Sequence, residues 1–207
     1  MTARKLTLDD IADARAYERE REEFRARVIA LKTIRRVPVG PVVSVVFENR
    51  DTIRFQIQEM ARAERILSDA GIQTELDIYN PLIPERGELS ATLYIELTSR
   101  PQMEEWLPKL VGIERALQLQ IGASKNDTRG NGSQTVVPAE VDAAHEATLT
   151  REEVTASVHY VRFALTPEQI EQFRDAPVAL AAEHPAYPET TVLSPETKSS
   201  LLEDLLG

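Results

Sequence analysis

The chain has 207 residues, no cysteine and a formal net charge of −10 at pH 7. The lack of cysteine excludes disulfides, a thiolate nucleophile and metal sites built on sulfur ligands of this chain. The negative charge disfavours binding to a phosphate backbone, so we expect no nucleic-acid partner. We find no signal peptide, and no uninterrupted apolar run approaches the roughly 18 residues of a membrane span, so we expect a cytoplasmic protein with no membrane partner.

The first half of the chain predicts two helices around a buried strand. The first helix runs from Thr7 to about Thr33 and begins with capping-box spacing. The strand Val42 to Phe47 is apolar on both faces, which is typical of a central strand. Asp51 is a suitable N-cap for a second helix over Thr52 to about Ala70, with Gly71 as its C′ residue.

The second half predicts shorter elements. We expect Thr74 to Tyr79 and Leu89 to Leu97 to pair as a hairpin. The further expected elements are a helix at 102–110, strands at 116–121, 155–165 and 177–182, a helix that starts at Thr166, and a terminal helix from Ser194 to about Leu206. The segment near 123–150 is polar and contains glycine, so we predict a mobile loop.

The order of these elements predicts an α+β fold. Strands and helices do not alternate regularly, which argues against a doubly wound parallel sheet. We expect a mostly antiparallel or mixed sheet flanked by helices, with a long N-terminal helix and a short C-terminal helix. We expect residues 1–207 to form one domain, while a division into two domains at the loop near 123–150 stays open.

Several segments resemble an uncharacterised bacterial family known only as a domain of unknown function of about this length. The segments that carry the resemblance are Phe47 to Met60, Glu75 to Pro84, Glu88 to Leu93 and Val158 to Phe163. The resemblance covers nearly the whole chain apart from the loop near 125–145. It implies genes placed beside those of a rubrerythrin-like diiron protein and an iron–sulfur oxidoreductase subunit, and hence a role in redox or oxidative-stress metabolism. It assigns no catalytic residues.

The expected second helix carries a carboxylate within its apolar stripe. Glu64 is predicted to be buried, because at about 100° per residue it lies among Ile53, Ile57, Met60 and Leu67. A buried carboxylate needs a cation, a metal or a proton. The candidate partners are Arg27, Arg50 and His159. Glu64 therefore forms either an internal salt bridge or part of a ligand or metal site.

The corner between the strand and this helix suits an anion. It carries Glu48, Asn49, Arg50, Arg54 and Gln58. Free N–H groups at a helix start attract anions, and two arginines one turn apart can hold a carboxylate or a phosphate. The alternative is a capped helix whose arginines pair with nearby acids. No glycine-rich phosphate cradle accompanies the corner.

His159 shares the expected inner face of its strand with Val161, Phe163 and Leu165, so we expect a core histidine with satisfied hydrogen bonds. Metal ligation is the alternative, and iron or manganese would suit the available carboxylates. These are Glu48, Glu59, Glu64, Glu75, Asp77 and Glu96. No Glu-x-x-His pair of the ferritin-like type occurs, which argues against a diiron bundle. We predict no cofactor, with iron or manganese left open.

The expected hairpin also predicts a polar, acidic outer sheet face, either solvated or lining a cleft. Its residues are Glu75, Asp77, Tyr79, Thr92, Tyr94 and Glu96. On the second helix, Phe55 and Ile66 lie opposite the main apolar stripe, so this side is covered either by another part of the chain or by a second subunit, which leaves a homodimer open.

The sequence contains no nucleophile elbow, Walker motif or dinucleotide fingerprint, so enzymatic function has no positive support. We expect a non-catalytic accessory or interaction protein linked to redox or oxidative-stress metabolism, with a rubrerythrin-like or iron–sulfur protein as partner. The alternative is a small-molecule or metal-binding protein, or an enzyme, with a site near Arg50, Glu64 and His159.

Overall fold

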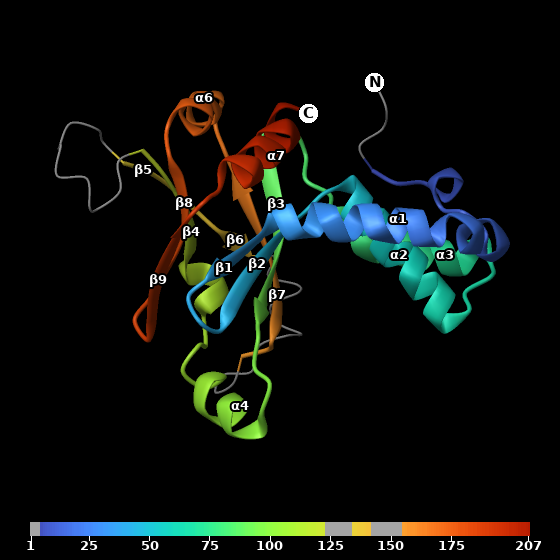
Figure 1. Ribbon diagram of the computed structural model, residues 1–207, viewed down its shortest axis with the longest axis horizontal. Coiled ribbons are helices and arrows are strands. Elements are labelled where there is room, and N and C mark those ends of the chain that lie inside the picture. Colours follow the sequence, from blue (N-terminus) through green and yellow to red (C-terminus); the bar gives the residue numbers. More distant parts are fainter. Residues whose placement is uncertain (1–4, 123–133, 142–154) are drawn as a thin grey trace.

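The computed structural model describes residues 5–122, 134–141 and 155–207, which form two antiparallel sheets and several helices (Figure 1). The strands are β1 Arg36–Val39, β2 Val43–Glu48, β3 Glu88–Ile95, β4 Leu117–Ile121, β5 Thr135–Pro138, β6 Glu140–Val141, β7 Val158–Ala164, β8 Val178–His184 and β9 Tyr187–Val192. The helices are η1 Leu8–Asp10, α1 Ala14–Arg35, α2 Arg50–Glu64, α3 Asp69–Tyr79, η2 Asn80–Leu82, α4 Arg100–Trp106, η3 Ile113–Ala116, α6 Pro167–Asp175 and α7 Pro195–Leu206. The predicted α+β class is confirmed.

The main core lies between the two sheets. The larger sheet has five strands in the order β1-β2-β3-β7-β6, and the smaller has four in the order β5-β4-β8-β9. Alternate residues of each strand point into the space between them, as the period of a pleated strand requires. Val45, Leu93 and Phe163 face inward from the larger sheet, and Leu119 and Leu180 from the smaller; each is 0% exposed.

The sheets are joined at both edges. The chain passes from β5 of one sheet to β6 of the other through Ala139, whose N–H donates to the Leu117 carbonyl of β4 at 2.9 Å. At the other edge, the buried Tyr187 hydroxyl of β9 donates to the Val39 carbonyl at 2.8 Å and accepts the Val42 N–H at 2.9 Å. The two sheets therefore form a closed sandwich around one core.

Helices α1, α2 and α3 lie together on the side of the larger sheet that faces away from the smaller sheet (Figure 1). Ile53, Ile57 and Leu76 fill the centre of this helical layer, while Tyr17 and Phe24 pack between α1 and α2. None of the described helices is long and apolar enough to span a membrane.

Helix α2 begins at Arg50 because Asn49, rather than the predicted Asp51, is its N-cap. The Asn49 side chain accepts the Thr52 N–H, and the Thr52 hydroxyl accepts the Asn49 N–H. The helix ends at Glu64, where Arg65 adopts the left-handed conformation with φ 57°, and not at the predicted Gly71. The chain then turns before a further helix.

The predicted strand Thr74 to Tyr79 is wrong, because these residues belong to α3. Ser68 caps α3 by accepting the Gly71 N–H, and Leu76 is its buried contact. The predicted hairpin is therefore wrong as well, and β3 pairs with β2 and β7 instead. Residues 134–141, predicted as part of a mobile loop, contain β5 and β6, whereas the rest of that loop lies largely outside the described residues.

Candidate binding site

Four polar side chains form a row across the larger sheet. Glu48 of β2 lies opposite Ser90 of β3, Ser90 lies opposite Arg162 of β7, and Arg162 lies opposite Glu140 of β6. Residues opposite each other in a sheet project to the same face. We call Glu48, Ser90, Arg162 and Glu140 the polar row; it lies on the face away from the main core.

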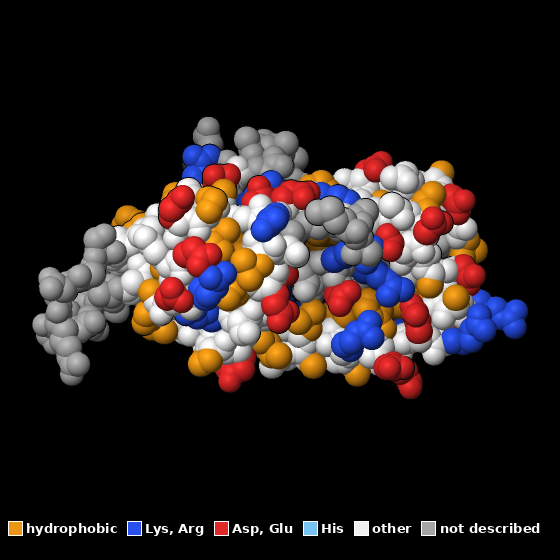
Figure 2. Space-filling model, turned by 90° about the horizontal axis from the view of Figure 1, so that it is seen from above, with side chains coloured by type: hydrophobic (Ala, Val, Ile, Leu, Met, Phe, Trp, Pro, Cys, Tyr) orange, Lys and Arg blue, Asp and Glu red, His pale blue; other side chains and the backbone are white. Residues whose placement is uncertain are grey.

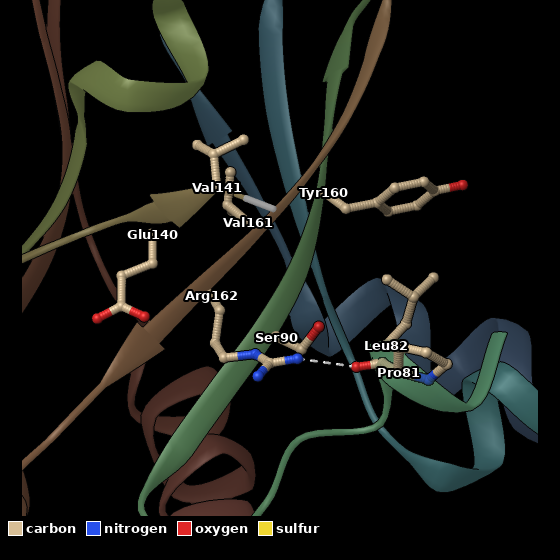
Figure 3. Close-up of a pocket in the computed structure, with 8 residues that line it drawn as sticks. All are labelled: Pro81, Leu82, Ser90, Glu140, Val141, Tyr160, Val161 and Arg162. Carbon is tan, nitrogen blue, oxygen red and sulfur yellow. Dashed lines mark hydrogen bonds between the residues drawn. The ribbon is translucent and has the colours of Figure 1, made fainter. Parts of the chain in front are cut away.

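A pocket of about 210 Å³ opens beside the polar row (Figure 3). Its polar lining consists of Ser90, Glu140, Tyr160 and Arg162. Its apolar lining consists of Pro81, Leu82, Val141 and Val161. We call this cavity the row pocket. It therefore joins the polar sheet face to η2 and to the short edge strand β6.

Arg162 is held at the wall of the row pocket. Its Nη2 donates to the Pro81 carbonyl of η2 at 3.0 Å, the hydrogen bond drawn in Figure 3. Its Nη1 lies 3.6 Å from a Glu88 carboxylate oxygen, beyond ordinary hydrogen-bond length. Helix η2 is in turn fixed by Asn80, whose amide pairs with both the N–H and the carbonyl of Leu6. The guanidinium position thus depends on contacts far apart in the sequence.

Glu48, at the other end of the polar row, is a buried acid with one unsatisfied oxygen. Its side chain is 1% exposed, and Oε1 accepts the Thr92 hydroxyl at 2.8 Å. Among the described residues, Oε2 has no hydrogen-bond partner, and Lys32 Nζ lies 3.9 Å away. A buried carboxylate with an unpaired oxygen lowers the stability of the fold. Glu48 is therefore a candidate functional residue.

Two tyrosines share this face with Glu48. Burial, followed by the nearby Glu48 charge, raises the pKa of Tyr94. Burial, then Tyr79 and then Glu48, raises the pKa of Tyr160. Both phenols therefore stay protonated at neutral pH and can donate hydrogen bonds.

Arg50, Arg54 and Gln58 of the predicted corner anchor the N-terminal segment, whereas Asn49 caps α2. Arg50 forms a 2.5 Å ion pair with Asp10, and Arg54 Nε donates to the Asp10 carbonyl at 2.8 Å. Gln58 accepts the Ala12 N–H at 2.7 Å and donates to the Ala12 carbonyl at 3.2 Å. Of the two alternatives from the sequence, the structure shows the capped helix with paired arginines.

The predicted burial of Glu64 is wrong. The side chain is exposed, and Leu67, expected on the same apolar stripe, is 80% exposed. The physical reason is that α2 ends at Glu64, so the helical periodicity on which the prediction depended does not reach residue 67. Glu64 therefore needs no buried cation.

His159 is a buried core residue, as predicted, on the opposite face of the sheet from Glu48. Its Nε2 lies 2.9 Å from both the Thr155 hydroxyl and the Ala156 carbonyl. Its Nδ1 lies 3.9 Å from Oε2 of Glu114, a buried oxygen with no hydrogen-bond partner in the described part of the chain. Thr155, His159 and Glu114 are arranged in the order of a hydroxyl–imidazole–carboxylate triad. The Ala156 carbonyl can only accept a hydrogen bond, so Nε2 of His159 carries a hydrogen. Nε2 therefore cannot remove the Thr155 proton.

The structure thus separates the residues predicted as one site. Glu48 belongs to the polar row, Arg50, Arg54 and Gln58 hold the N-terminal segment, Glu64 is exposed, and His159 faces the main core. Within the described ranges, no group of three or more His, Cys, Asp or Glu side chains could hold a metal ion.

Sequence reasoning missed Ser90, Glu140 and Arg162 as site residues. The available signal was the alternation of polar with apolar side chains in Glu88 to Leu93 and Val158 to Phe163. That alternation indicates a polar face but not which strands are neighbours. Only the observed register brings Ser90 beside Arg162.

Comparison with known proteins places the chain in a family. Residues 5–205 match the family described as "Protein of unknown function (DUF3501)". The chain belongs to this family. It is also similar to a crystal structure of a protein of unknown function from Burkholderia pseudomallei K96243, with 36% identity, a TM-score of 0.84, and coverage of 97% of this chain and 99% of that chain. No curated protein matches. The resemblance to an uncharacterised family is confirmed.

Proposed function

We propose that this DUF3501 protein is a non-catalytic binding protein that holds a small polar molecule in the row pocket. The observation that carries the proposal is the polar row itself, in which four strands bring Glu48, Ser90, Arg162 and Glu140 to one face beside a cavity. Small-molecule pockets typically combine apolar walls with a few convergent polar groups, and the row pocket has this composition.

The chemistry of the row pocket favours binding over catalysis. Ser90 has no histidine beside it in the polar row, and Arg162 does not release a proton in proteins. His159 lies on the opposite face of the sheet, behind the backbone of β7. The polar groups of the pocket are therefore suited to hold and orient a molecule.

A binding test follows from the open rim of the pocket. Glu140 is exposed, so Glu140→Trp places a large ring at the pocket without altering the core. Native mass spectrometry of the protein in a mixture of small polar metabolites should detect a bound molecule on the wild type and not on Glu140→Trp. Glu104→Trp, on the exposed α4, is the matched control and should bind normally. Equal binding by both variants would contradict the proposal.

We also propose that the protein works in the cytoplasm as an accessory to a redox partner of the rubrerythrin-like or iron–sulfur type. The family resemblance motivates this second role, and the corner between α2 and α3 supports an interaction. Leu67 is 80% exposed there, beside a groove of about 170 Å³ whose lining includes Ile11, Ala61, Ile66 and Ile72. Figure 2 shows acidic and basic side chains intermixed on the face that it draws, unlike a basic nucleic-acid-binding face.

Co-purification tests the partner role. Tagged wild-type protein and Met103→Asp, which changes an exposed apolar residue of α4, should recover the proposed partner, and Leu67→Asp should not. Failure of the wild type to recover either type of redox protein would remove the support for this role.

A further inference from the structure

We infer that the row pocket binds a small monocarboxylate anion with a short apolar body, whose carboxylate contacts Arg162 and Ser90. The inference rests on the proposed binding function and names its ligand class. It starts from the guanidinium, because Arg162 is a cation among the residues that line the pocket.

The guanidinium of Arg162 is held in place, but the described residues do not use all of its hydrogen-bond donors. It has five N–H donors. Among the described residues, it makes one hydrogen bond, to Pro81, and one longer ion pair, to Glu88 at 3.6 Å. The side chain is 40% exposed, so donors remain open to the pocket. A planar guanidinium held in this way matches the two oxygens of a carboxylate.

The Ser90 hydroxyl supplies a second donor at the same place. Ser90 lies directly opposite Arg162 and is only 3% exposed. No hydrogen bond joins its hydroxyl to another residue in the described part of the chain, so it can donate to a ligand oxygen. Figure 3 shows both side chains on the side of the pocket that faces Pro81 and Leu82.

The remaining lining limits the rest of the ligand. Pro81 and Leu82 give the pocket an apolar side, so the body of the ligand should be apolar; the side chains of Val141 and Val161, from the strands that line the pocket, pack into the main core. The pocket of about 210 Å³ corresponds to roughly seven water-sized groups at ~30 Å³ each, so the body is short. Glu140 at the rim repels a second negative group, which favours a monocarboxylate over a dicarboxylate or phosphate.

Isovalerate is a suitable probe, with isovaleramide, isoamylamine and inorganic phosphate as comparison compounds. Titrations followed by NMR should show isovalerate shifting the signals of Val141 and Val161, with the other three compounds binding more weakly. Arg162→Gln should weaken isovalerate binding about tenfold or more, because a charge-assisted pair is lost. Arg162→Lys should bind with intermediate affinity, since it retains the charge and loses the planar fork. Arg100→Gln, at a residue 89% exposed on α4, should bind like the wild type.

The outcomes separate this inference from the proposed function. Failure of isovalerate to bind, or equal binding by Arg162→Gln, would overturn the carboxylate inference. Tighter binding of the amide, the amine or phosphate at the same NMR signals would also overturn it and leave the binding function intact. A metabolite that binds wild type and Glu140→Trp equally would contradict the binding function itself. Thermal unfolding of each variant shows whether a loss of binding reflects a loss of fold.

Discussion

Arg35 of α1 and Asp204 of α7 form an ion pair between two helices, although the two residues are 169 positions apart in the chain. Arg35 is 1% exposed, and it also donates to the carbonyls of Phe47 at 2.8 Å and Glu48 at 3.1 Å. One buried guanidinium therefore ties α1, the end of β2 and α7 together. It also fixes the backbone of Glu48 at one end of the polar row.

We expect Arg35→Met to lower the free energy of unfolding by about 3 kcal/mol, because it leaves Asp204 and two backbone carbonyls without their cation. Urea denaturation followed by circular dichroism measures the loss. Arg100→Met removes an arginine that is 89% exposed and should change stability by less than about 0.5 kcal/mol. A loss as small as that of the control would show that α7 does not depend on Arg35.

Gln58→Leu tests how the N-terminal segment is held. The change removes the two hydrogen bonds between the Gln58 amide and the backbone of Ala12, and we expect a loss of about 2 kcal/mol. Gln73→Leu, on the exposed side of α3, is the control and should be nearly neutral. If Gln58→Leu is equally neutral, the segment is held by its apolar contacts alone.

Glu59 should make stability depend on pH. The hydrogen bond from Arg21 lowers the pKa of Glu59 below its ordinary value, against the effect of burial, and the Tyr17 hydroxyl adds to the lowering. The ionised form is favoured in the folded state, so its contribution is present at neutral pH and is lost as pH falls through the folded-state pKa. The stability gap between wild type and Glu59→Gln should therefore narrow on acidification. Glu104→Gln should show a small gap at every pH, and a Glu59→Gln gap that widens in acid would contradict this account.

Glu48→Gln should raise the free energy of unfolding by about 1 kcal/mol, because it removes a buried charge with an unpaired oxygen. The amide oxygen of glutamine can still accept the Thr92 hydroxyl. Chemical denaturation at neutral pH, together with Lys32→Gln and the double variant, separates the charge effect from the 3.9 Å approach of Lys32. A loss of stability in Glu48→Gln would instead show that Lys32 compensates the acid.

The sequence predicted the parts of the fold that depend on local pattern. A period of two in the side-chain pattern predicted the alternation in β3 and β7 and the core position of His159. β-branched side chains predicted the buried strand at Val42 to Phe47. The end of α2 could not be predicted in this way, because Arg65 is a non-glycine residue in the left-handed region and carries no stop signal. The wrong burial of Glu64 and the wrong strand in α3 both follow from this missed break.

The candidate site was harder to predict because it depends on pairing between distant strands. Glu48 was identified from its place at a strand end, but its neighbour Ser90 lies 42 positions later (90 − 48) and is brought there only by the register of β2 and β3. The sequence predicts Arg50 and Arg54 as ligand-binding residues, but in the structure both contact Asp10. Charged residues near a helix start do not reveal which acids the tertiary fold brings to them.

The passage of the chain from β5 to β6 through Ala139 also affects how the protein opens. The continuous segment of β5, Ala139 and β6 contributes to both sheets. Neither sheet can separate from this segment without exposing the core that both sheets share, so hydrogen exchange in the two sheets is coupled. Hydrogen exchange at Leu119 of β4 and Val161 of β7 should therefore report a single opening event of the whole sandwich. Because β3 carries Ser90 and β7 carries Arg162, the same opening event would also take the row pocket apart.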